Sequence, residues 1–286
     1  MGDNVLSAEE IEKKYPPRQL SDSQYVTRIA PSPTGFMHIG GIYAALISER
    51  FAHQSKGVFI LRIEDTDTKR EIEGATDLII RSLSEYGLVV DEGPVNENEE
   101  IGAYGPYTQS KRKKIYQAYV KQLLEKGMAY PCFCTEEEIE AMRERQTKAG
   151  GRPGYYGLWA KDRNLSEEQV KANLDAGKPF VIRFKSPGKY INKIAVEDIL
   201  RGKRFFPEND LDIVILKSDG LPTYHFAHIV DDHLMGTTHV VRGDEWLSSL
   251  PLHIQLFEAM GWKAPKYGHI APIQKLDEGA RRKLSK

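Results

Sequence analysis

The sequence has very little cysteine, and its two cysteines are separated by a single residue. Cys132 and Cys134 are the only two in 286 residues. They are too few and too close together for a disulfide framework, which excludes disulfide-stabilised secreted folds and indicates a reducing compartment. No apolar run approaches the roughly 18 residues of a membrane span, and residues 1–24 lack the apolar stretch of a signal peptide. We therefore expect a cytoplasmic protein with no membrane partner.

The chain also has almost no net charge and no internal repeat. A formal charge of −1 predicts no nucleic-acid partner, so any such partner has to be argued from local features. The length exceeds the common single-domain size, which favours two domains or one domain with a large insertion. Residues 1–20 are a polar extension whose order the sequence leaves open.

Strand-like and helix-like stretches alternate near both ends of the chain. The first half of this pattern has predicted strands at 25–30 and 58–63 and helices at 42–53 and 68–86. The pattern resumes late, with strands at 211–217 and 238–243 and helices that end near 232 and 260, the second stopped by Gly261. Strands separated by helices of this size favour an α/β fold with a parallel sheet covered by helices.

The middle of the chain lacks this alternation. An amphipathic helix is predicted over 110–126, and capping boxes at Thr135 and Ser166 open two further helices before a strand at 180–184. We interpret residues 107–209 as a mixed α/β domain inserted into the first domain. That domain then consists of residues 21–106 and 210–275, followed by a C-terminal loop, 276–286.

The stretch "RIAPSPTGFMHIGG" breaks a strand with prolines and glycines before a helix begins. A helix N-terminus at the end of a parallel strand carries partial positive charge and free N–H groups, which suit a phosphate. Gly40 and Gly41 let a ligand approach the backbone, and His38 can donate to a phosphate oxygen. A tight turn with a capping histidine explains the same residues. Similarly, Glu64 after the second strand and the basic C-terminus are each explained by a solvated surface.

Together these stretches resemble the class I aminoacyl-tRNA synthetases. "HIGG" is similar to their "HIGH" signature and "KLSK" to their "KMSKS" signature. The wider text, "RIAPSPTGFMHIGG", "LRIEDTD", "GPYTQS", "DGLPTYHFAHIVDDHLMG" and "VVRGDEW", resembles bacterial-type glutamyl-tRNA synthetases from about Arg28 to Lys286. "APSPT" stands where the glutaminyl enzymes of this family usually read "PPEPN".

The resemblance implies a Rossmann-like, doubly wound parallel sheet interrupted by an acceptor-binding domain. It implies activation of L-glutamate by ATP, as its Mg²⁺ complex, and transfer to the 3′ end of tRNA(Glu), in a monomer that binds the tRNA acceptor arm. The implied catalytic residues are His38, Lys283 and Lys286. The implied glutamate-binding residues are Arg28, Ala30, Ser32, Glu64, Tyr224, His228 and Arg242. The implied ATP-binding residues are His38, Gly40, Gly41, Glu245, Trp246 and Lys286.

The chain departs from the family pattern in three places. Trp159 stands where the family often has a cysteine that completes a zinc site. Tyr155, Tyr156 or a distant histidine could complete it instead, but we expect no zinc and two buried or half-buried thiols. His228 stands where some members carry asparagine. The chain stops inside the lysine signature, which predicts a catalytic fragment with a mobile C-terminal loop and weak activity.

Two other functions stay open at this stage. One is the short paralogue that glutamylates queuosine on tRNA, although "GDEW" and the long inserted block favour the true synthetase. The other is a non-catalytic domain that binds glutamate or tRNA. Candidate contacts to tRNA are basic and aromatic residues that a solvated face or the core explains equally well: Lys111–Lys114, Arg152, Tyr155, Tyr156, Lys161 and Arg163.

Overall fold

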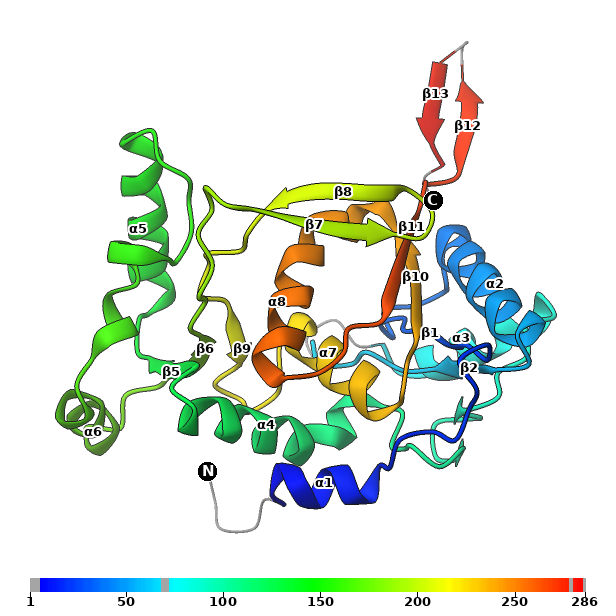
Figure 1. Ribbon diagram of the computed structural model, residues 1–286, viewed down its shortest axis with the longest axis horizontal. Helices are drawn as coiled ribbons and strands as arrows, with labels where there is room; N and C mark the ends of the chain where they lie inside the picture. Colours follow the sequence, from blue (N-terminus) through cyan, green and yellow to red (C-terminus); the bar gives the residue numbers. More distant parts are fainter. Residues whose placement is uncertain (1–5, 68–71, 278–279, 285–286) are drawn as a thin grey trace.

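The computed structural model describes residues 6–67, 72–277 and 280–284. The predicted first β-α-β unit is present as β1 (Val26–Ile29), α2 (Ile39–Gln54) and β2 (Val58–Leu61). β1 and β2 pair in parallel, and α2 packs on both of them (Figure 1). The next helix, α3 (Ala75–Glu85), begins later than the sequence predicts, after Gly74 with a φ of 76°. Residues 68–71 of that predicted helix lie outside the described residues.

A second parallel pair is built from β10 (His239–Gly243) and β11 (Lys266–Ile270). α8 (Leu250–Met260) connects them and ends at Gly261, as the sequence predicts. β10 lies beside β1, and the Thr238 N–H donates to the Val26 carbonyl at 2.9 Å. The predicted parallel sheet is therefore present as two hydrogen-bonded pairs that meet along β1 and β10.

The prediction for residues 211–217 is correct as a strand but wrong as part of the parallel sheet. β9 (Val214–Leu216) pairs antiparallel with β6 (Val181–Phe184), which pairs antiparallel with β5 (Ala129–Cys132). An apolar run of this length is buried equally well in either kind of sheet, so its composition does not choose a partner.

The sequence analysis missed a hairpin, β7 (Lys193–Asp198) and β8 (Gly202–Pro207). Most of its residues are exposed or half-buried, so it carries no strong apolar signal. Asp198 pairs with Tyr267 of β11, which joins the hairpin to the sheet of β10. Strands from either side of residue 209 thus pair with each other in both sheets.

The remaining helices confirm the predicted capping boxes. Thr135 and Ser166 cap α5 and α6 through reciprocal hydrogen bonds with Glu138 and Gln169. Figure 1 shows these two helices at one end of the molecule. The other elements are α4 (Lys113–Glu125), α7 (Tyr224–Leu234), the pair β3 (Gly93–Pro94) and β4 (Glu100–Ile101), the pair β12 (Gln274–Asp277) and β13 (Ala280–Lys283), and the 3₁₀ turns 109–112, 157–159, 161–164 and 244–249.

The N-terminal stretch contains a helix that packs on the core. α1 (Ala8–Lys14) opens with a capping box at Ser7. It contacts α4, buries Ile11 and Tyr15, and Tyr119 donates to Glu12 at 2.7 Å. This packing orders part of the stretch whose order the sequence left open.

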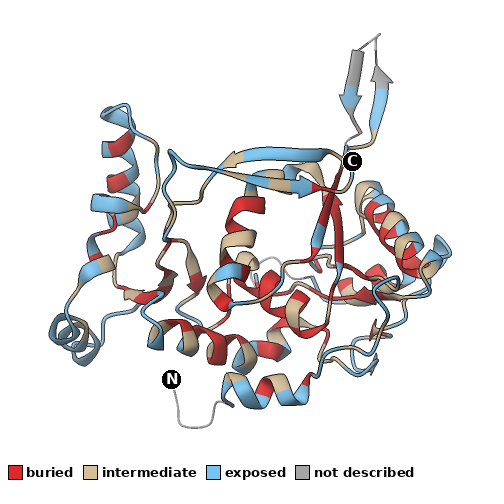
Figure 2. Cartoon of the chain, viewed as in Figure 1, coloured by how far each residue is buried: buried red, intermediate tan, exposed pale blue. Residues whose placement is uncertain are grey.

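Two apolar clusters form most of the core (Figure 2). One lies among α1, α4, α7 and α8, and the other lies between α2, α3 and the strands β1 and β2. A buried network of charges lies near them, in which Arg62 pairs with Asp232 and Arg112 pairs with Asp231, each at 2.7 Å. Among the described helices, none is long and apolar enough to cross a membrane.

Candidate functional site

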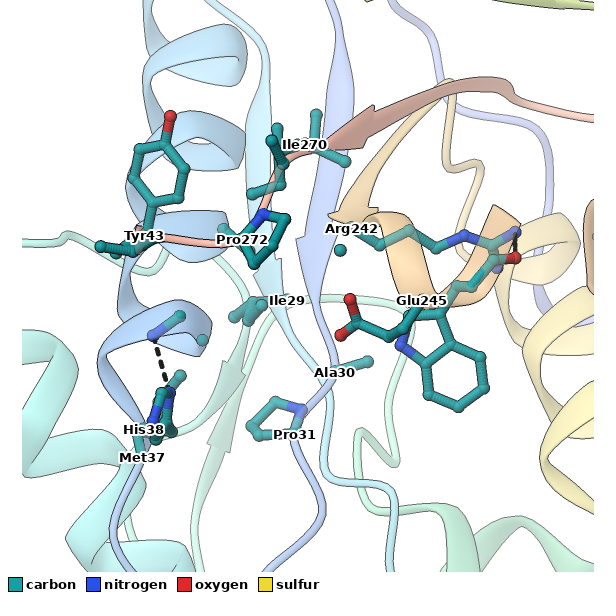
Figure 3. A pocket seen from close by; sticks show the side chains of 18 of the residues that line it. Ile29, Ala30, Pro31, Met37, His38, Tyr43, Arg242, Glu245, Ile270 and Pro272 are labelled. Carbon is teal, nitrogen blue, oxygen red and sulfur yellow. Dashed lines mark hydrogen bonds between the residues drawn. The ribbon is translucent and has the colours of Figure 1, made fainter. Parts of the chain in front are cut away.

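A cavity of ≈ 320 Å³ lies at the carboxyl ends of β1 and β10. Its wall is completed by the start of α2, by the 3₁₀ turn after β10 and by the segment after β11 (Figure 3). This is the sheet edge at which α/β proteins collect their ligands. Ten of the predicted site residues line it: Arg28, Ala30, His38, Gly40, Gly41, Glu64, Tyr224, Arg242, Glu245 and Trp246.

Two predicted site residues whose side chains the structure describes, Ser32 and His228, are not among those that line this cavity. Ser32 is exposed, and His228 is buried beneath the cavity, stacked on Tyr224 with ring centroids 5.8 Å apart. Lys283 lies at the end of β13, next to Leu284, which does line the cavity. Lys286 lies outside the described residues.

The sequence analysis missed the apolar part of the lining. Met37, Tyr43, Ile270, Pro272 and Ile273 belong to it. Ile270 is the last residue of β11, and Pro272 and Ile273 come directly after that strand. β11 was not predicted from the sequence. The alternation of Tyr267 and His269 with small or apolar residues was the only local signal for it.

His38 begins α2 and caps it with its own ring. Its Nδ1 accepts a hydrogen bond from the Gly40 N–H at 3.1 Å (Figure 3). A backbone N–H can only donate, so Nδ1 carries a lone pair and the ring proton of the neutral form is on Nε2. The cap therefore leaves His38 with a donor beside the free N–H groups of the helix, and both suit a phosphate oxygen.

Two buried arginines give the cavity its positive charge. Arg28 lies 3.3 Å from Asp232, a carboxylate that it shares with Arg62. Arg242 has no ion pair with any carboxylate among the described residues. Figure 3 shows Arg242 and His38 on either side of the end of β1. A ligand that fills the cavity thus meets a cation on one side and a helix N-terminus on the other.

Glu64 is the acidic group of the cavity. Its Oε1 is 3.4 Å from Arg62 Nη2, and its side chain is 9% exposed. Burial raises the pKa of Glu64 to about 7, against the opposing effects of the Arg62 and Arg28 charges. Burial also raises the pKa of the Tyr224 hydroxyl. Two arginines, one carboxyl and one phenol together can hold an amino acid with a second carboxylate.

The comparisons with known proteins agree with this geometry. The family described as tRNA synthetases class I (E and Q), catalytic domain, matches residues 24–286. The chain belongs to this family. It is 57% identical to a glutamate–tRNA ligase from Clostridium perfringens over 274 residues, which are 96% of the chain and 50% of that relative. It is 48% identical to a glutamate–tRNA ligase from Sorangium cellulosum, covering all of the chain and 55% of that relative.

Solved structures show the same fold. The glutamate–tRNA synthetase of Elizabethkingia anophelis is 44% identical with a TM-score of 0.83, over 92% of the chain and 52% of that structure. A glutamate–tRNA ligase from Elizabethkingia meningosepticum, solved in complex with its amino acid, matches equally well. These structures confirm the α/β class of the fold. The chain spans about half the length of the relatives it matches.

In this tRNA synthetase family member, most candidate tRNA contacts have structural partners. Arg112 is buried in its ion pair with Asp231, and Tyr155 is also buried. Lys111 and Lys114 are exposed. Three further basic residues pair with acidic neighbours: Arg152 with Asp210, Lys161 with Glu138 and Arg163 with Asp212. Of the two explanations left open for these residues, burial favours an internal role for Arg112 and Tyr155.

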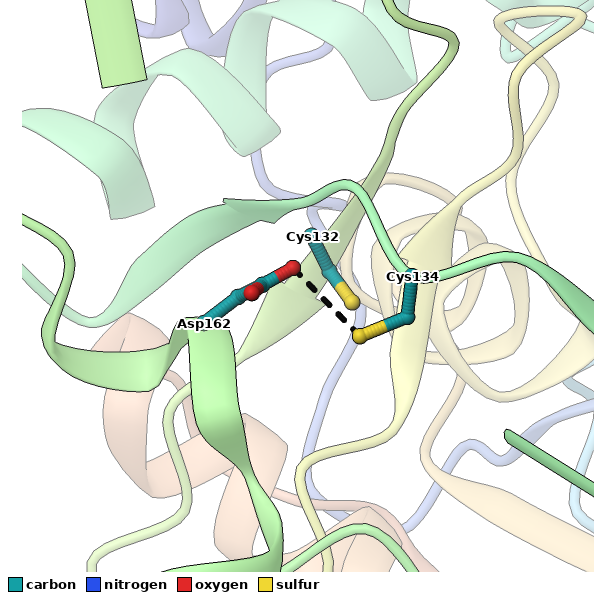
Figure 4. A group of neighbouring side chains, drawn as sticks. All are labelled: Cys132, Cys134 and Asp162. Carbon is teal, nitrogen blue, oxygen red and sulfur yellow. Dashed lines mark hydrogen bonds between the residues drawn. The ribbon is translucent and has the colours of Figure 1, made fainter. Parts of the chain in front are cut away.

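One group of neighbouring side chains among the described residues could hold a metal ion. The ligand atoms of Cys132, Cys134 and Asp162 lie within 4.8 Å of one another (Figure 4). A closed structural zinc site needs four ligands. The Tyr155 hydroxyl, a further polar group, lies 3.4 and 3.5 Å from the sulfurs. Burial raises the pKa of that hydroxyl far above its usual range. Trp159 packs against the cluster without offering a ligand.

The polar groups of this cluster lie within hydrogen-bond distance of one another. The Cys134 thiol donates to Asp162, and the same carboxylate accepts from the Phe133 N–H at 2.7 Å. The cluster therefore offers three ligand atoms, one fewer than a closed structural zinc site needs.

Proposed function

We propose that the chain is the catalytic part of a glutamate–tRNA ligase. It activates L-glutamate with ATP and transfers the glutamyl group to the 3′ end of tRNA(Glu). The observation that carries the proposal is the single cavity lined by His38, Glu64 and Arg242, in a chain 57% identical to a glutamate–tRNA ligase. In this proposal the parallel strands form a Rossmann-like, doubly wound sheet, and residues 107–209 are the inserted acceptor-binding domain.

The first step joins glutamate to ATP. A carboxylate oxygen of glutamate attacks the α-phosphorus, an O–P bond forms, and the bond to the β-phosphate breaks to release pyrophosphate. Negative charge grows on the phosphate oxygens, and donors fixed in advance stabilise it. His38 Nε2–H and the N-terminus of α2 supply these donors at the α-phosphate. Lys283 and Lys286 hold the pyrophosphate, and bound Mg²⁺ enters with ATP.

The second step transfers the glutamyl group. A ribose hydroxyl at the 3′ end of tRNA attacks the activated carbonyl carbon and forms a new C–O bond. The bond between that carbon and the AMP oxygen breaks, AMP leaves with its electron pair, and the hydroxyl proton passes to a phosphate oxygen. No covalent bond to the protein is needed, because two bound substrates held in line supply much of the rate gain. In the ground state Arg28 and Arg242 hold the carboxylates, Glu64 holds the ammonium, and Tyr224 donates one hydrogen bond.

The direct test is ATP–pyrophosphate exchange with tRNA(Glu) present. We expect exchange that depends on glutamate and is not supported by glutamine. Binding of glutamate and ATP without any exchange would instead favour a non-catalytic binding domain. Glutamylation of a queuosine-containing tRNA, with none of tRNA(Glu), would favour the short paralogue.

The KM for glutamate should fall as pH rises through 7. Glu64 binds the ammonium only when it is ionised, and its pKa is raised to about 7. Because a group with this pKa is about one-tenth ionised at pH ~6, we expect a KM about tenfold higher there than at pH ~8. Steady-state exchange assays across this range measure it. The Glu64→Gln variant should have a high KM for glutamate that does not change between these pH values. A wild-type KM that is equally independent of pH would show that Glu64 does not bind the ammonium.

Metal analysis should find no stoichiometric zinc in protein purified without chelator. The cluster at Cys132 and Cys134 offers one ligand fewer than a closed site needs. The Trp159→Cys variant is the matched test, because it restores a thiol at the position where the family often has one, and we expect it to gain zinc. One zinc ion per chain in the unmodified protein would show that Asp162 and Tyr155 complete the site.

A further inference from the structure

Arg242 is a buried cation whose neighbours are imidazoles rather than carboxylates. Its Nε–H donates to His269 Nε2 at 2.9 Å, and its Nη1 lies 3.1 Å from His253 Nδ1. Its Nη2 donates to the Trp246 carbonyl at 3.2 Å. Three different elements therefore fix the guanidinium: β11, α8 and the 3₁₀ turn after β10.

Arginine chemistry determines the direction of these hydrogen bonds. The guanidinium has five N–H donors and no acceptor, so each imidazole nitrogen that faces it presents a lone pair. His269 then carries its proton on Nδ1, and His253 carries its proton on Nε2. Burial and the Arg242 charge lower the pKa of both imidazoles. Both histidines are thus neutral acceptors that orient the cation without cancelling its charge.

Asp198 selects the tautomer of His269. Its Oδ2 lies 2.5 Å from His269 Nδ1 and accepts a hydrogen bond from the N–H there. The carboxylate is itself held by the N–H groups of Leu200 at 3.0 Å and Arg201 at 2.9 Å, in the turn between β7 and β8. A carboxylate on one ring nitrogen fixes the proton and directs the other nitrogen at its target. The hairpin missed by the sequence analysis therefore reaches Arg242 through His269.

His253 is fixed in a similar way from the helical side. Its Nε2–H donates to His225 Nδ1 at 3.0 Å, which joins α8 to α7. The exposed surface of His253 is negligible, as is that of His269. Neither ring can turn away into solvent, so the two acceptors lie at fixed positions around Arg242.

The contacts leave Arg242 with a free fork. Of its five N–H donors, one goes to each of His269, His253 and the Trp246 carbonyl. The two that remain belong to Nη1 and Nη2, the pair of atoms that binds a carboxylate through two parallel hydrogen bonds. Arg28 differs, since it already shares the Asp232 carboxylate. The unpaired charge and the free fork both make Arg242 a receptor for a carboxylate that comes from outside the protein.

We propose that Asp198 and His269 are positioning residues that hold the guanidinium of Arg242 in line for a carboxylate of the amino-acid substrate. His253 of α8 positions the same guanidinium from the helical side. The inference rests on the proposed function and assigns the specificity of the cavity to residues that do not touch the substrate. Its consequence is that these buried groups control the affinity for glutamate separately from the affinity for ATP.

The test compares Asp198→Asn, His269→Gln and His269→Ala with a matched control, His239→Gln. His239 is a buried histidine of β10 whose Nδ1 lies 2.9 Å from the Thr238 hydroxyl, and it has no hydrogen bond to Arg242 among the described residues. ATP–pyrophosphate exchange with tRNA(Glu) gives the KM for glutamate and for ATP. We expect Asp198→Asn and His269→Ala to raise the KM for glutamate about 10- to 100-fold, the effect of losing a hydrogen bond to a buried charge.

The expected pattern is specific to positioning. The KM for ATP stays within about twofold, and the control resembles the wild type. His269→Gln, whose side-chain oxygen can accept from Arg242, recovers part of the affinity that His269→Ala loses. The double variant of Asp198 and His269 is no weaker than the worse single variant, because both act through one contact.

Several results would overturn the inference and leave the proposed function intact. One is a wild-type KM for glutamate in both Asp198→Asn and His269→Gln. Another is an equal rise of both KM values, which indicates general damage to the fold. A melting curve shows whether His269→Ala folds. If it does not, Asp198→Asn and His269→Gln still test the inference. If the wild type shows no exchange, the result contradicts the proposed function and not this inference. Calorimetric measurement of glutamate binding to the same variants then tests the inference.

Discussion

Replacing Arg242 with alanine is expected to raise the KM for glutamate by at least about 100-fold and to leave the KM for ATP nearly unchanged. Arg242 is 5% exposed and has no carboxylate partner among the described residues, so a substrate carboxylate is its natural counterion. Removing one partner of a buried, hydrogen-bonded charge pair costs about 2–5 kcal/mol, and ~3 kcal/mol corresponds to a factor of more than 100. Exchange assays with glutamate and ATP varied in turn measure the two constants.

The control for this variant is Arg204→Ala. Arg204 is an exposed arginine of β8, so its loss changes the net charge by the same amount without touching the cavity. We expect both of its KM values to match the wild type. Similar increases in both KM values of Arg242→Ala would place Arg242 outside the amino-acid site.

The second large effect is expected for His38→Ala, which should lower kcat by about 100- to 1000-fold, the value of one donor at a developing oxyanion. The ring's Nδ1 is occupied by the Gly40 N–H, so the donor lost from the cavity is Nε2–H. The KM for glutamate should change little, because His38 lies on the side of the cavity away from Arg242 (Figure 3). Single-turnover formation of the adenylate measures this step.

His38→Asn separates catalysis from helix capping. Asparagine caps a helix as well as any residue, but its amide is shorter and does not carry a donor to the place of Nε2–H. We expect this variant to melt like the wild type and still to lose most of the kcat. Full activity of His38→Asn would mean that the histidine serves only as the cap of α2.

Local signals were enough to predict the parts of the fold that depend on neighbours in sequence. The helix that starts after His38, the capping boxes of α5 and α6, and the stop at Gly261 all follow from contacts within a few residues. Strand pairing does not, because it is decided between segments far apart in the chain. β9 has the composition of a central parallel strand and pairs antiparallel with β6, and the exposed β7–β8 hairpin left no apolar pattern to find.

The cavity was predictable to a similar extent. Residues within quoted motifs, such as Arg28, Glu64 and Arg242, do lie around one cavity. Asp198 and His269 were not found, because each looks like an ordinary polar residue until the fold brings them within 2.5 Å of each other. Their partner in that arrangement, Arg242, contacts His269 across two adjacent strands, and a single sequence contains no record of that proximity.

The central claim is that one cavity holds an acidic amino acid and the phosphates of ATP side by side. Its most direct test is calorimetric titration with a non-hydrolysable sulfamoyl analogue of glutamyl-adenylate, which joins both parts in one molecule. We predict that the analogue binds at least about 100-fold more tightly than glutamate, and that both Arg242→Ala and His38→Ala weaken it. The account would be contradicted if the analogue bound no more tightly than glutamate, or if its affinity were the same for the wild type and both variants.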